Sequence, residues 1–215
     1  AADTAGSAKY LFLGVKPQMM AGLLAELGPV LKRRTDRFLL VSMAAGLTIA
    51  DIRRMAGGEY PVIRIMPNTP ASVGAGMTLY ACGTGVTGDE EAEFLRSMAA
   101  AGAFSALPEN LIDAGGAVSG CGTAFADLFL EAMADGGVAC GVPRAKALEF
   151  AAQALIGSAR LMQESGLHPG ELKDAVCSPG GSTIQGVRTL ERSGFRSAVM
   201  EAVIAAFEKN QALGK

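Results

Sequence analysis

The feature that most constrains the fold is a change of sequence pattern near residue 107. Before this point, short continuous apolar runs alternate with segments of helical periodicity, and after Pro108 every periodic segment is helical. Apolar strands without polar alternation are typical of a parallel sheet that helices cover on both faces. The sequence therefore predicts an α/β domain at residues 1–107, followed by an all-helical domain at residues 108–215.

The first domain contains four apolar runs of strand length. They lie at residues 10–15, 38–42, 62–66 and, more weakly, 78–81. Helical patterns at 18–33 and 88–101 lie between and after them. Thr48, followed three residues later by Asp51, predicts a capping box that opens a further short helix.

The helix expected at residues 120–137 is apolar on all sides. One face carries Phe125, Leu128, Phe129, Ala132 and Met133, and the other carries Leu130 and Ala134. A helix that is apolar all round is buried all round, and a single chain of this size has little with which to cover both faces. The pattern predicts a homodimer formed through the helical domain, and it leaves open a higher oligomer of such dimers.

The composition excludes several classes of function. Lys and Arg number 19 and Asp and Glu 21, with no basic block, so we expect neither a nucleic-acid nor a membrane partner. His168 is the single histidine, which argues against a metal site, and its place before Pro169 predicts a helix start. Four cysteines without C-x-x-C spacing suit a reducing compartment, so a cytoplasmic location is expected.

The segment SPGGST at residues 178–183 is the strongest candidate site. Gly180 and Gly181 let a ligand approach the backbone, and Ser182 and Thr183 begin a helix whose first N–H groups have no partner in the helix. A carboxylate or phosphate would be stabilised there by N–H groups, hydroxyls and the positive end of the helix. The alternative is a plain turn between helices, with Ser182 as the N-cap.

Two further candidates follow strands of the first domain. In open parallel sheets, ligands bind beyond the carboxyl ends of the strands. The residues expected there are Gly14, Val15, Lys16 and Pro17 after the first strand, and Asn68 and Thr69, between two prolines, after the third. A solvated lysine and a turn built by Asn and Pro are the alternative interpretations.

Seven short motifs together resemble those of one known family. They are VKPQ at 15–18, RIMPNTP at 64–70, GCGTAF at 120–125, GVPR at 141–144, HP at 168–169, SPGGST at 178–183 and GFR at 194–196. In this order and spacing they resemble the pyrroline-5-carboxylate reductases. The resemblance implies an incomplete Rossmann-type domain, a helical dimerisation domain, and NADPH- or NADH-dependent reduction of 1-pyrroline-5-carboxylate to L-proline, the last step of proline biosynthesis.

The resemblance also implies roles for the candidate residues. Residues 14–17 would lie beside NADP or NAD, and Asn68 and Thr69 would lie on its nicotinamide side. The substrate carboxylate would be held by Ser178, Gly180, Gly181, Ser182 and Thr183. Thr183 would in addition hydrogen-bond the imine nitrogen, which makes it the expected catalytic residue.

The chain departs from the family pattern at two places. Cys121, Thr123 and Phe125 replace a serine, a proline and a tyrosine, which puts the substrate fit near that turn in doubt. No strand with a G-x-G-x-x-G turn precedes the run at 10–15, so we expect these 215 residues, taken as the whole polypeptide, to bind NAD(P)H poorly.

Two other functions compete with this interpretation. A related two-domain reductase could act on another imine or on a β-hydroxyacid. The β-hydroxyacid class typically needs a lysine on the first long helix of the helical domain, and residues 120–140 contain no lysine. A catalytically idle, dimerising paralogue or fragment is the alternative from outside the enzymes.

Overall fold

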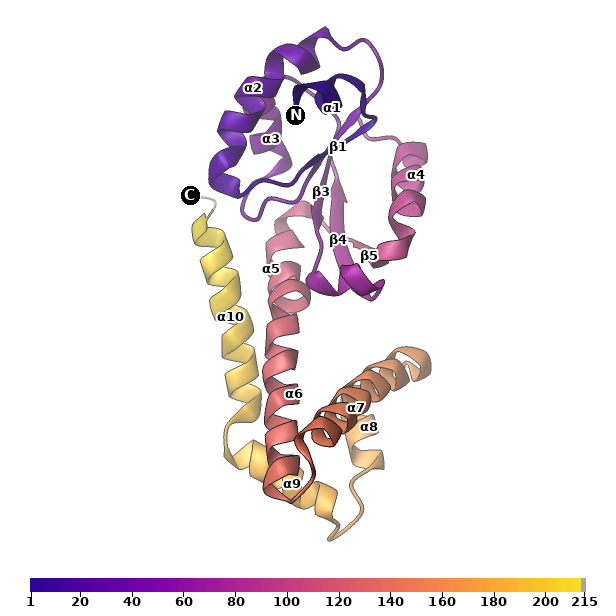
Figure 1. Ribbon diagram of the computed structural model, residues 1–215, viewed down its shortest axis with the longest axis vertical. Coiled ribbons are helices and arrows are strands. Elements are labelled where there is room, and N and C mark those ends of the chain that lie inside the picture. Colours follow the sequence, from indigo (N-terminus) through magenta and orange to yellow (C-terminus); the bar gives the residue numbers. More distant parts are fainter. Residues whose placement is uncertain (214–215) are drawn as a thin grey trace. The chain divides into compact units, whose positions relative to one another are not determined.

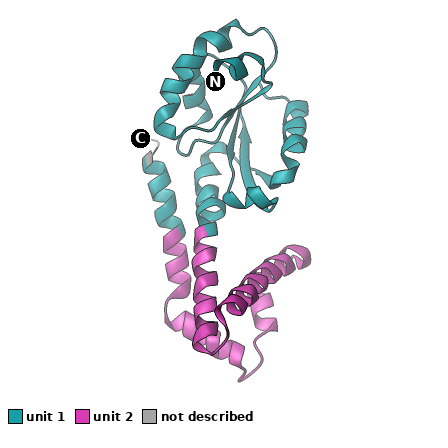
Figure 2. Cartoon of the chain, viewed as in Figure 1, with its two compact units in different colours: residues 1–123, 203–215 teal, residues 124–202 magenta. Residues whose placement is uncertain are grey.

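The computed structural model describes residues 1–213 (Figure 1). The chain forms two compact units, shown in Figure 2: residues 1–123 together with the segment from 203 onward, and residues 124–202. No helix among residues 1–213 has the length and apolar character needed to cross a membrane.

The first unit is built on a five-stranded sheet. Its strands, in spatial as well as sequence order, are β1 (Tyr10–Leu13), β2 (Leu39–Ser42), β3 (Val62–Met66), β4 (Gly76–Cys82) and β5 (Gly102–Ala106). Its main helices are α1 (Ala2–Ser7), α2 (Met20–Arg33), α3 (Ile49–Ala56), α4 (Gly88–Met98) and α5 (Ile112–Gly116). The four predicted strands and the capping box of Thr48 and Asp51 are confirmed.

The sheet is parallel, as predicted, with one exception. The pairs β1–β2, β2–β3 and β4–β5 are parallel, whereas β3 and β4 run antiparallel. The connection between β3 and β4, residues 67–75, is shorter than the roughly dozen residues that a parallel crossover needs. The strand at 76–82 therefore turns back along β3, and the prediction of an all-parallel sheet was wrong for this pair.

The core lies on both faces of the sheet. On one face, Leu40 and Val62 pack with apolar side chains of α2 and α3. On the other face, Val41 and Ile63 pack with Phe94 of α4. Figure 1 shows α2 and α3 on one side of the strands and α4 on the other. Strand β2 is buried along its whole length, which explains why its sequence is a continuous apolar run.

Two elements of this unit were not predicted. Helix α1 is held by Arg34, whose guanidinium Nη1 donates hydrogen bonds to the carbonyls of Ala5 (2.9 Å) and Ala8 (2.8 Å). Strand β5 has the sequence GAFSA, which lacks an apolar run, and it forms because it pairs with β4. Gly102 has φ +123°, and a Cβ there would lie 2.2 Å from the Gly76 carbonyl oxygen, so only glycine fits.

The second unit is entirely helical. Its helices are α6 (Gly122–Ala139), α7 (Arg144–Ser165), α8 (Pro169–Ala175) and α9 (Ser182–Arg192), with the first part of α10 (Phe195–Leu213). His168 caps α8 as predicted, since its Nδ1 accepts a hydrogen bond from the backbone N–H of Gly170 (3.1 Å). Helix α6 is preceded by a π-turn at Ala117–Cys121, so the turn expected at Gly120 is a wide helical turn.

The first unit does not end where the sheet ends, because it continues past β5 to residue 123. The short helix α5 follows β5, yet Ile112 and Gly116 are buried within the first unit, and Ile112 belongs to the core beside β3 and β4. The expected domain boundary between residues 107 and 108 stays a prediction.

Candidate substrate and cofactor sites

The first group of predicted site residues lies at one edge of the sheet. Leu13 of β1, Ser42 of β2 and Arg64 of β3 are aligned by the parallel register, so these strands end at the same edge. The segments after β1 and β3 emerge two strand spacings apart, roughly 10 Å. Residues 14–17 and 68–69 are therefore brought to the carboxyl edge of the parallel strands.

The chemistry of this edge suits a dinucleotide. Gly14, Lys16 and Thr69 are exposed, whereas Val15 and Pro17 are half-buried. An exposed ammonium group, a hydroxyl and open backbone at one edge can contact phosphate and ribose groups. The residues present fit a nicotinamide cofactor, and their assignment to it stays a prediction.

Asn68 differs from Thr69 because its side-chain amide is already used within the protein. Its Nδ2 donates to the Ser119 carbonyl, and its Oδ1 accepts from the Met77 backbone N–H, both at 2.9 Å. The sequence located the loop but not these partners, which lie 51 and 9 residues away.

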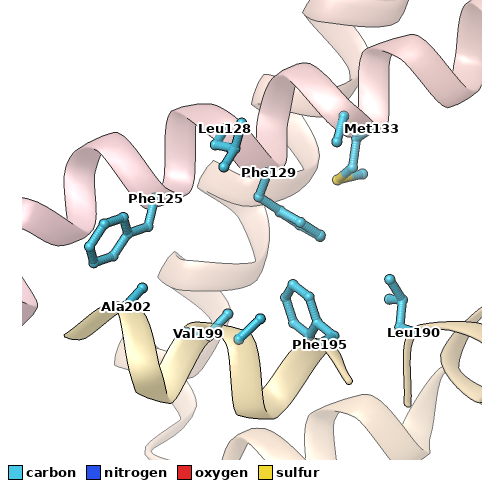
Figure 3. Close-up of a pocket in the computed structure, with 10 residues that line it drawn as sticks. Phe125, Leu128, Phe129, Met133, Leu190, Phe195, Val199 and Ala202 are labelled. Carbon is cyan, nitrogen blue, oxygen red and sulfur yellow. The ribbon is translucent and has the colours of Figure 1, made fainter. Parts of the chain in front are cut away.

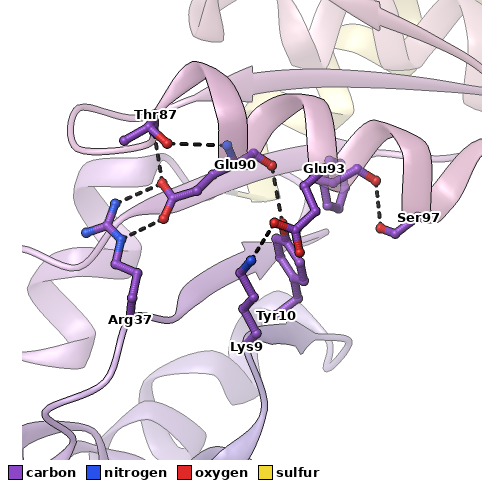
Figure 4. Close-up of polar contacts among 8 residues, drawn as sticks. Lys9, Tyr10, Arg37, Thr87, Glu90, Glu93 and Ser97 are labelled. Carbon is purple, nitrogen blue, oxygen red and sulfur yellow. Dashed lines mark hydrogen bonds and ion pairs between the residues drawn. The ribbon is translucent and has the colours of Figure 1, made fainter.

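A glycine pattern that the sequence analysis missed lies between β4 and α4. Gly83, Gly85 and Gly88 have the spacing G-x-G-x-x-G, which in some folds opens a phosphate-binding helix. Here the helix end is closed, because Thr87 and Glu90 form a capping box (Figure 4). The first turn also carries three carboxylates, which would repel a phosphate. This turn is structural.

Glu90 is the most strongly held carboxylate of that turn. It accepts hydrogen bonds from Arg37 Nε (2.6 Å) and Nη2 (2.9 Å) and from the Thr87 backbone N–H (2.9 Å). These contacts, the bonds from Arg37 first, lower the pKa of Glu90 from 4.5 to about 2. Figure 4 shows that Lys9 and Glu93 form a second ion pair beside it, which joins α4 to the start of β1.

The second group of predicted residues lies in the helical unit, in the loop between α8 and α9. Gly180 has φ +73°, a conformation that favours glycine. A Cβ at Gly181 would lie 2.5 Å from the Ser178 hydroxyl oxygen. The backbone conformation therefore favours glycine at 180, a side chain at 181 would displace the Ser178 hydroxyl, and Ser178 folds back toward the start of α9. The backbone N–H of Gly181 closes this turn by donating to the Ser178 carbonyl (3.0 Å).

Helix α9 begins one residue earlier than the cap prediction assumed. The N-cap is Gly181, and Ser182 is the first helical residue, so the prediction that Ser182 caps this helix was wrong. Gly181 adopts an extended conformation and has no side chain to accept from the first turn. Ser182 and Thr183 are both exposed, and the first N–H groups of α9 have no side-chain cap. This leaves a helix end that can bind an anion.

The three departures from the family pattern have different surroundings. Thr123 donates from its hydroxyl to the Gly120 carbonyl (2.8 Å), a bond that the family's proline could not make. Phe125 lines an apolar hollow between α6 and α10, and Cys121 is half-buried and forms no disulfide within the part of the chain that the structure describes.

The apolar hollow, with a volume of about 610 Å³, contains none of the predicted site residues. Figure 3 shows Phe125, Phe129, Phe195 and Val199 facing one another across it, and the rings of Phe129 and Phe195 are 5.5 Å apart. Leu128 at its edge is 67% exposed. Such a surface suits apolar side chains and does not suit a carboxylate. Among residues 1–213, no group of three or more His, Cys, Asp or Glu residues is placed to hold a metal ion.

A Rossmann-type sheet with polar groups at the carboxyl edge of its parallel strands, followed by a helical unit, is an arrangement typical of dinucleotide-dependent oxidoreductases.

The relatives define the family within this class. A pyrroline-5-carboxylate reductase of Synechocystis sp. is 45% identical over 213 residues, which cover 99% of this chain and 78% of that protein. The chain belongs to the pyrroline-5-carboxylate reductase family. A second such protein, from Escherichia coli, is 44% identical over 215 residues, covering 100% of this chain and 79% of its own length.

Two further comparisons agree with this. Residues 109–213 match the family model described as pyrroline-5-carboxylate reductase dimerisation. The crystal structure of Plasmodium falciparum pyrroline carboxylate reductase with NADP bound is similar with a TM-score of 0.91 and 32% identity, and the match covers 100% of this chain and 80% of that one. The predicted fold class and family are confirmed.

Proposed function

We propose that this chain reduces the C=N bond of 1-pyrroline-5-carboxylate to give L-proline, with NADPH or NADH as the reductant, in the last step of proline biosynthesis. The observation that carries this proposal is the match to the reductase family over the whole chain, together with an uncapped helix start at the SPGGST loop. The substrate is an anion with an imine nitrogen, and the loop offers both kinds of contact.

The carboxylate binds at the start of α9. The first N–H groups of this helix point out of its end, where the helix dipole favours a negative charge. The turn at Gly180 and Gly181 brings the Ser178 hydroxyl to the same place, and Ser182 supplies a second hydroxyl. In this proposal Ser178, Gly180, Gly181 and Ser182 hold the substrate by its carboxylate.

Thr183 acts on the imine. NADPH or NADH, when bound, supplies the hydride that reduces the imine carbon. The nitrogen needs a proton in the product, and the exposed Thr183 hydroxyl can hydrogen-bond that nitrogen, orient the ring and relay a proton to it from water, which restores the hydroxyl. Thr183 is thus the catalytic residue of this proposal.

The cofactor is assigned to residues of the first unit. Gly14, Val15, Lys16 and Pro17 lie after β1, and exposed Thr69 lies after β3, all at the carboxyl edge. Asn68 belongs to the same loop. The assay of this proposal uses NADPH or NADH in excess.

The working form is a homodimer. The matched dimerisation model covers the helices, and the apolar hollow between α6 and α10 leaves Leu128 exposed in a single chain. A second copy of the helical region would cover this surface. A larger assembly of dimers and a cytoplasmic location stay predictions.

The test is a spectrophotometric assay with three variants. Purified protein is mixed with 1-pyrroline-5-carboxylate and NADPH or NADH, cofactor oxidation is followed by absorbance, and L-proline is identified as the product. Thr183→Ala should lower kcat by roughly tenfold to a thousandfold, and Thr183→Ser should restore most of it. Thr189→Ala is the matched control, because the Thr189 hydroxyl only donates to the Gln185 carbonyl of the same helix (3.0 Å).

Two outcomes would contradict the proposal, and a third would show that the Thr183 variants do not report on the hydroxyl alone. Absence of proline formation by folded protein would exclude the activity. Unchanged kinetics of Thr183→Ala would remove this hydroxyl from the mechanism. An equal loss in Thr189→Ala would show that α9 had been perturbed as a whole.

A further inference from the structure

The π-turn at Ala117–Cys121 receives hydrogen bonds from two side chains. Asn68 donates to the Ser119 carbonyl (2.9 Å), and Thr123 donates to the next carbonyl, that of Gly120 (2.8 Å). Wide turns of this kind are rare insertions in helices and are frequent at functional sites. Asn68 is the donor that comes from a distant part of the chain.

Asn68 connects three segments of the first unit. Its backbone belongs to the loop after β3, its Oδ1 accepts from the Met77 N–H at the start of β4, and its Nδ2 reaches the π-turn. Each polar atom of this amide has a partner within the protein. The neighbouring residue Thr69 is exposed.

Close packing on the same side of the loop limits its movement. A Cβ on Gly116 would lie 3.0 Å from Met66 Cγ, so the end of β3 lies against α5 immediately before the π-turn. The Ser119 hydroxyl is buried there and has no hydrogen-bond partner among residues 1–213. A loop held by packing at Met66 and by two hydrogen bonds at Asn68 has little freedom.

We propose that Asn68 is a positioning residue and that its side chain does not bind the cofactor. Its two hydrogen bonds fix the loop after β3 to the start of β4 and to the π-turn. This places Thr69 at the carboxyl edge of the sheet, for the nicotinamide side of NAD(P)H. The cofactor assignment rests on the proposed function, whereas the bridge itself is a property of the unliganded protein.

The bridge is tested by hydrogen exchange without any cofactor. Asn68→Ala removes both bonds, so the Met77 amide and the amides following the π-turn should exchange faster. Asn68→Asp keeps an acceptor for Met77 but cannot donate to the Ser119 carbonyl, so only the π-turn should exchange faster. Ser72→Ala is the control, because it removes a different bond of the same loop, to the Thr69 carbonyl (3.0 Å).

The kinetic readout separates positioning from general destabilisation. Both Asn68 variants should raise the KM for NADPH roughly three- to tenfold, with smaller changes in kcat and in the KM for 1-pyrroline-5-carboxylate. Ser72→Ala should stay within twofold of wild type. A mere loss of folded protein would lower the apparent kcat and leave both KM values unchanged.

The results distinguish the alternatives. A raised KM for NADPH in Asn68→Asp, with unchanged exchange at the π-turn, would make Asn68 a direct ligand and overturn the inference. Unchanged exchange and unchanged KM in both variants would overturn it as well. If wild-type protein forms no proline, the proposed function fails, and the exchange data still decide whether the bridge exists.

Discussion

Removing the Asp113 carboxylate should strongly destabilise the first unit, because it leaves a buried arginine without its main partner. Arg64 lies in β3 and is 2% exposed. Its Nη2 donates to Asp113 Oδ1 (2.6 Å), and its Nη1 lies 3.7 Å from Glu109 Oε1. Its Nε has no hydrogen-bond partner among the described residues. The guanidinium therefore depends on one close carboxylate.

The magnitude follows from this geometry. Breaking a buried ion pair on one side costs about 3–5 kcal/mol, because a charge is left buried and unpaired. Glu109 remains nearby and the Asp113 side chain is 20% exposed, so we expect Asp113→Ala to lower the free energy of unfolding by about 2–4 kcal/mol. Asp113→Asn keeps an acceptor and should lose about half as much.

The decisive variant removes both charges. Arg64→Met with Asp113→Leu replaces the pair by apolar side chains, and its stability should lie within about 1 kcal/mol of wild type. Asp135→Ala is the matched control, because its pair with Arg144 is 51–60% exposed, and it should cost less than about 1 kcal/mol.

The assay is urea unfolding followed by circular dichroism at pH 7. If Asp113→Ala unfolds at the same urea concentration as Asp135→Ala, the buried pair does not stabilise the unit as argued. If the double variant is as unstable as Asp113→Ala, the loss of stability comes from changed packing around α5 and not from an unpaired charge.

Three further predictions follow from the geometry. Because Arg37 lowers the pKa of Glu90 from 4.5 to about 2, their pair stabilises the fold above about pH 4.5 and this contribution is lost as the pH falls toward 2. With Arg37 half exposed, Glu90→Gln should cost about 1–2 kcal/mol at pH 7 in urea unfolding and less at pH 3; an equal cost at both values would contradict the assignment. Gly181→Ala should raise the KM for 1-pyrroline-5-carboxylate roughly tenfold or more, since its Cβ would lie 2.5 Å from a hydroxyl oxygen, whereas Gly186→Ala, which has open space, should not; equal KM values would refute this. Leu128→Glu should shift the protein from dimer to monomer in gel filtration, and a persistent dimer would place the interface elsewhere.

The sequence predicted the strands that are buried on both faces, because such strands consist of continuous apolar residues. Residues 39–42 are apolar because both faces of β2 are covered. Residues 102–106 contain only one large apolar side chain and form a strand because β4 offers them hydrogen bonds, which no local pattern reveals. The antiparallel pairing of β3 and β4 was open to prediction, since the connection at 67–75 is short for a crossover.

The candidate sites divide in the same way. The glycines at 180 and 181 marked a turn correctly, because a positive φ and a close approach have a local signature. The two hydrogen bonds of Asn68 have no such signature, since they depend on which distant carbonyl and N–H the fold brings near. The glycine spacing at 83–88 matches a known phosphate-binding pattern without being such a site. The capping box of Thr87 and Glu90 occupies the helix start at which a phosphate would bind.

The exposed apolar side chains of the helical unit make its thermal stability depend on the protein concentration. A single copy leaves Leu128 and Phe150 more than half exposed, so a second copy of the chain can bury apolar surface that one copy leaves in contact with water. Association of the folded chains then adds to the stability of residues 124–202 by mass action. Each tenfold dilution weakens the dimer by about 1.4 kcal/mol relative to its separated chains. Dilution therefore acts on this enzyme as a mild denaturant, and its melting temperature should rise with concentration.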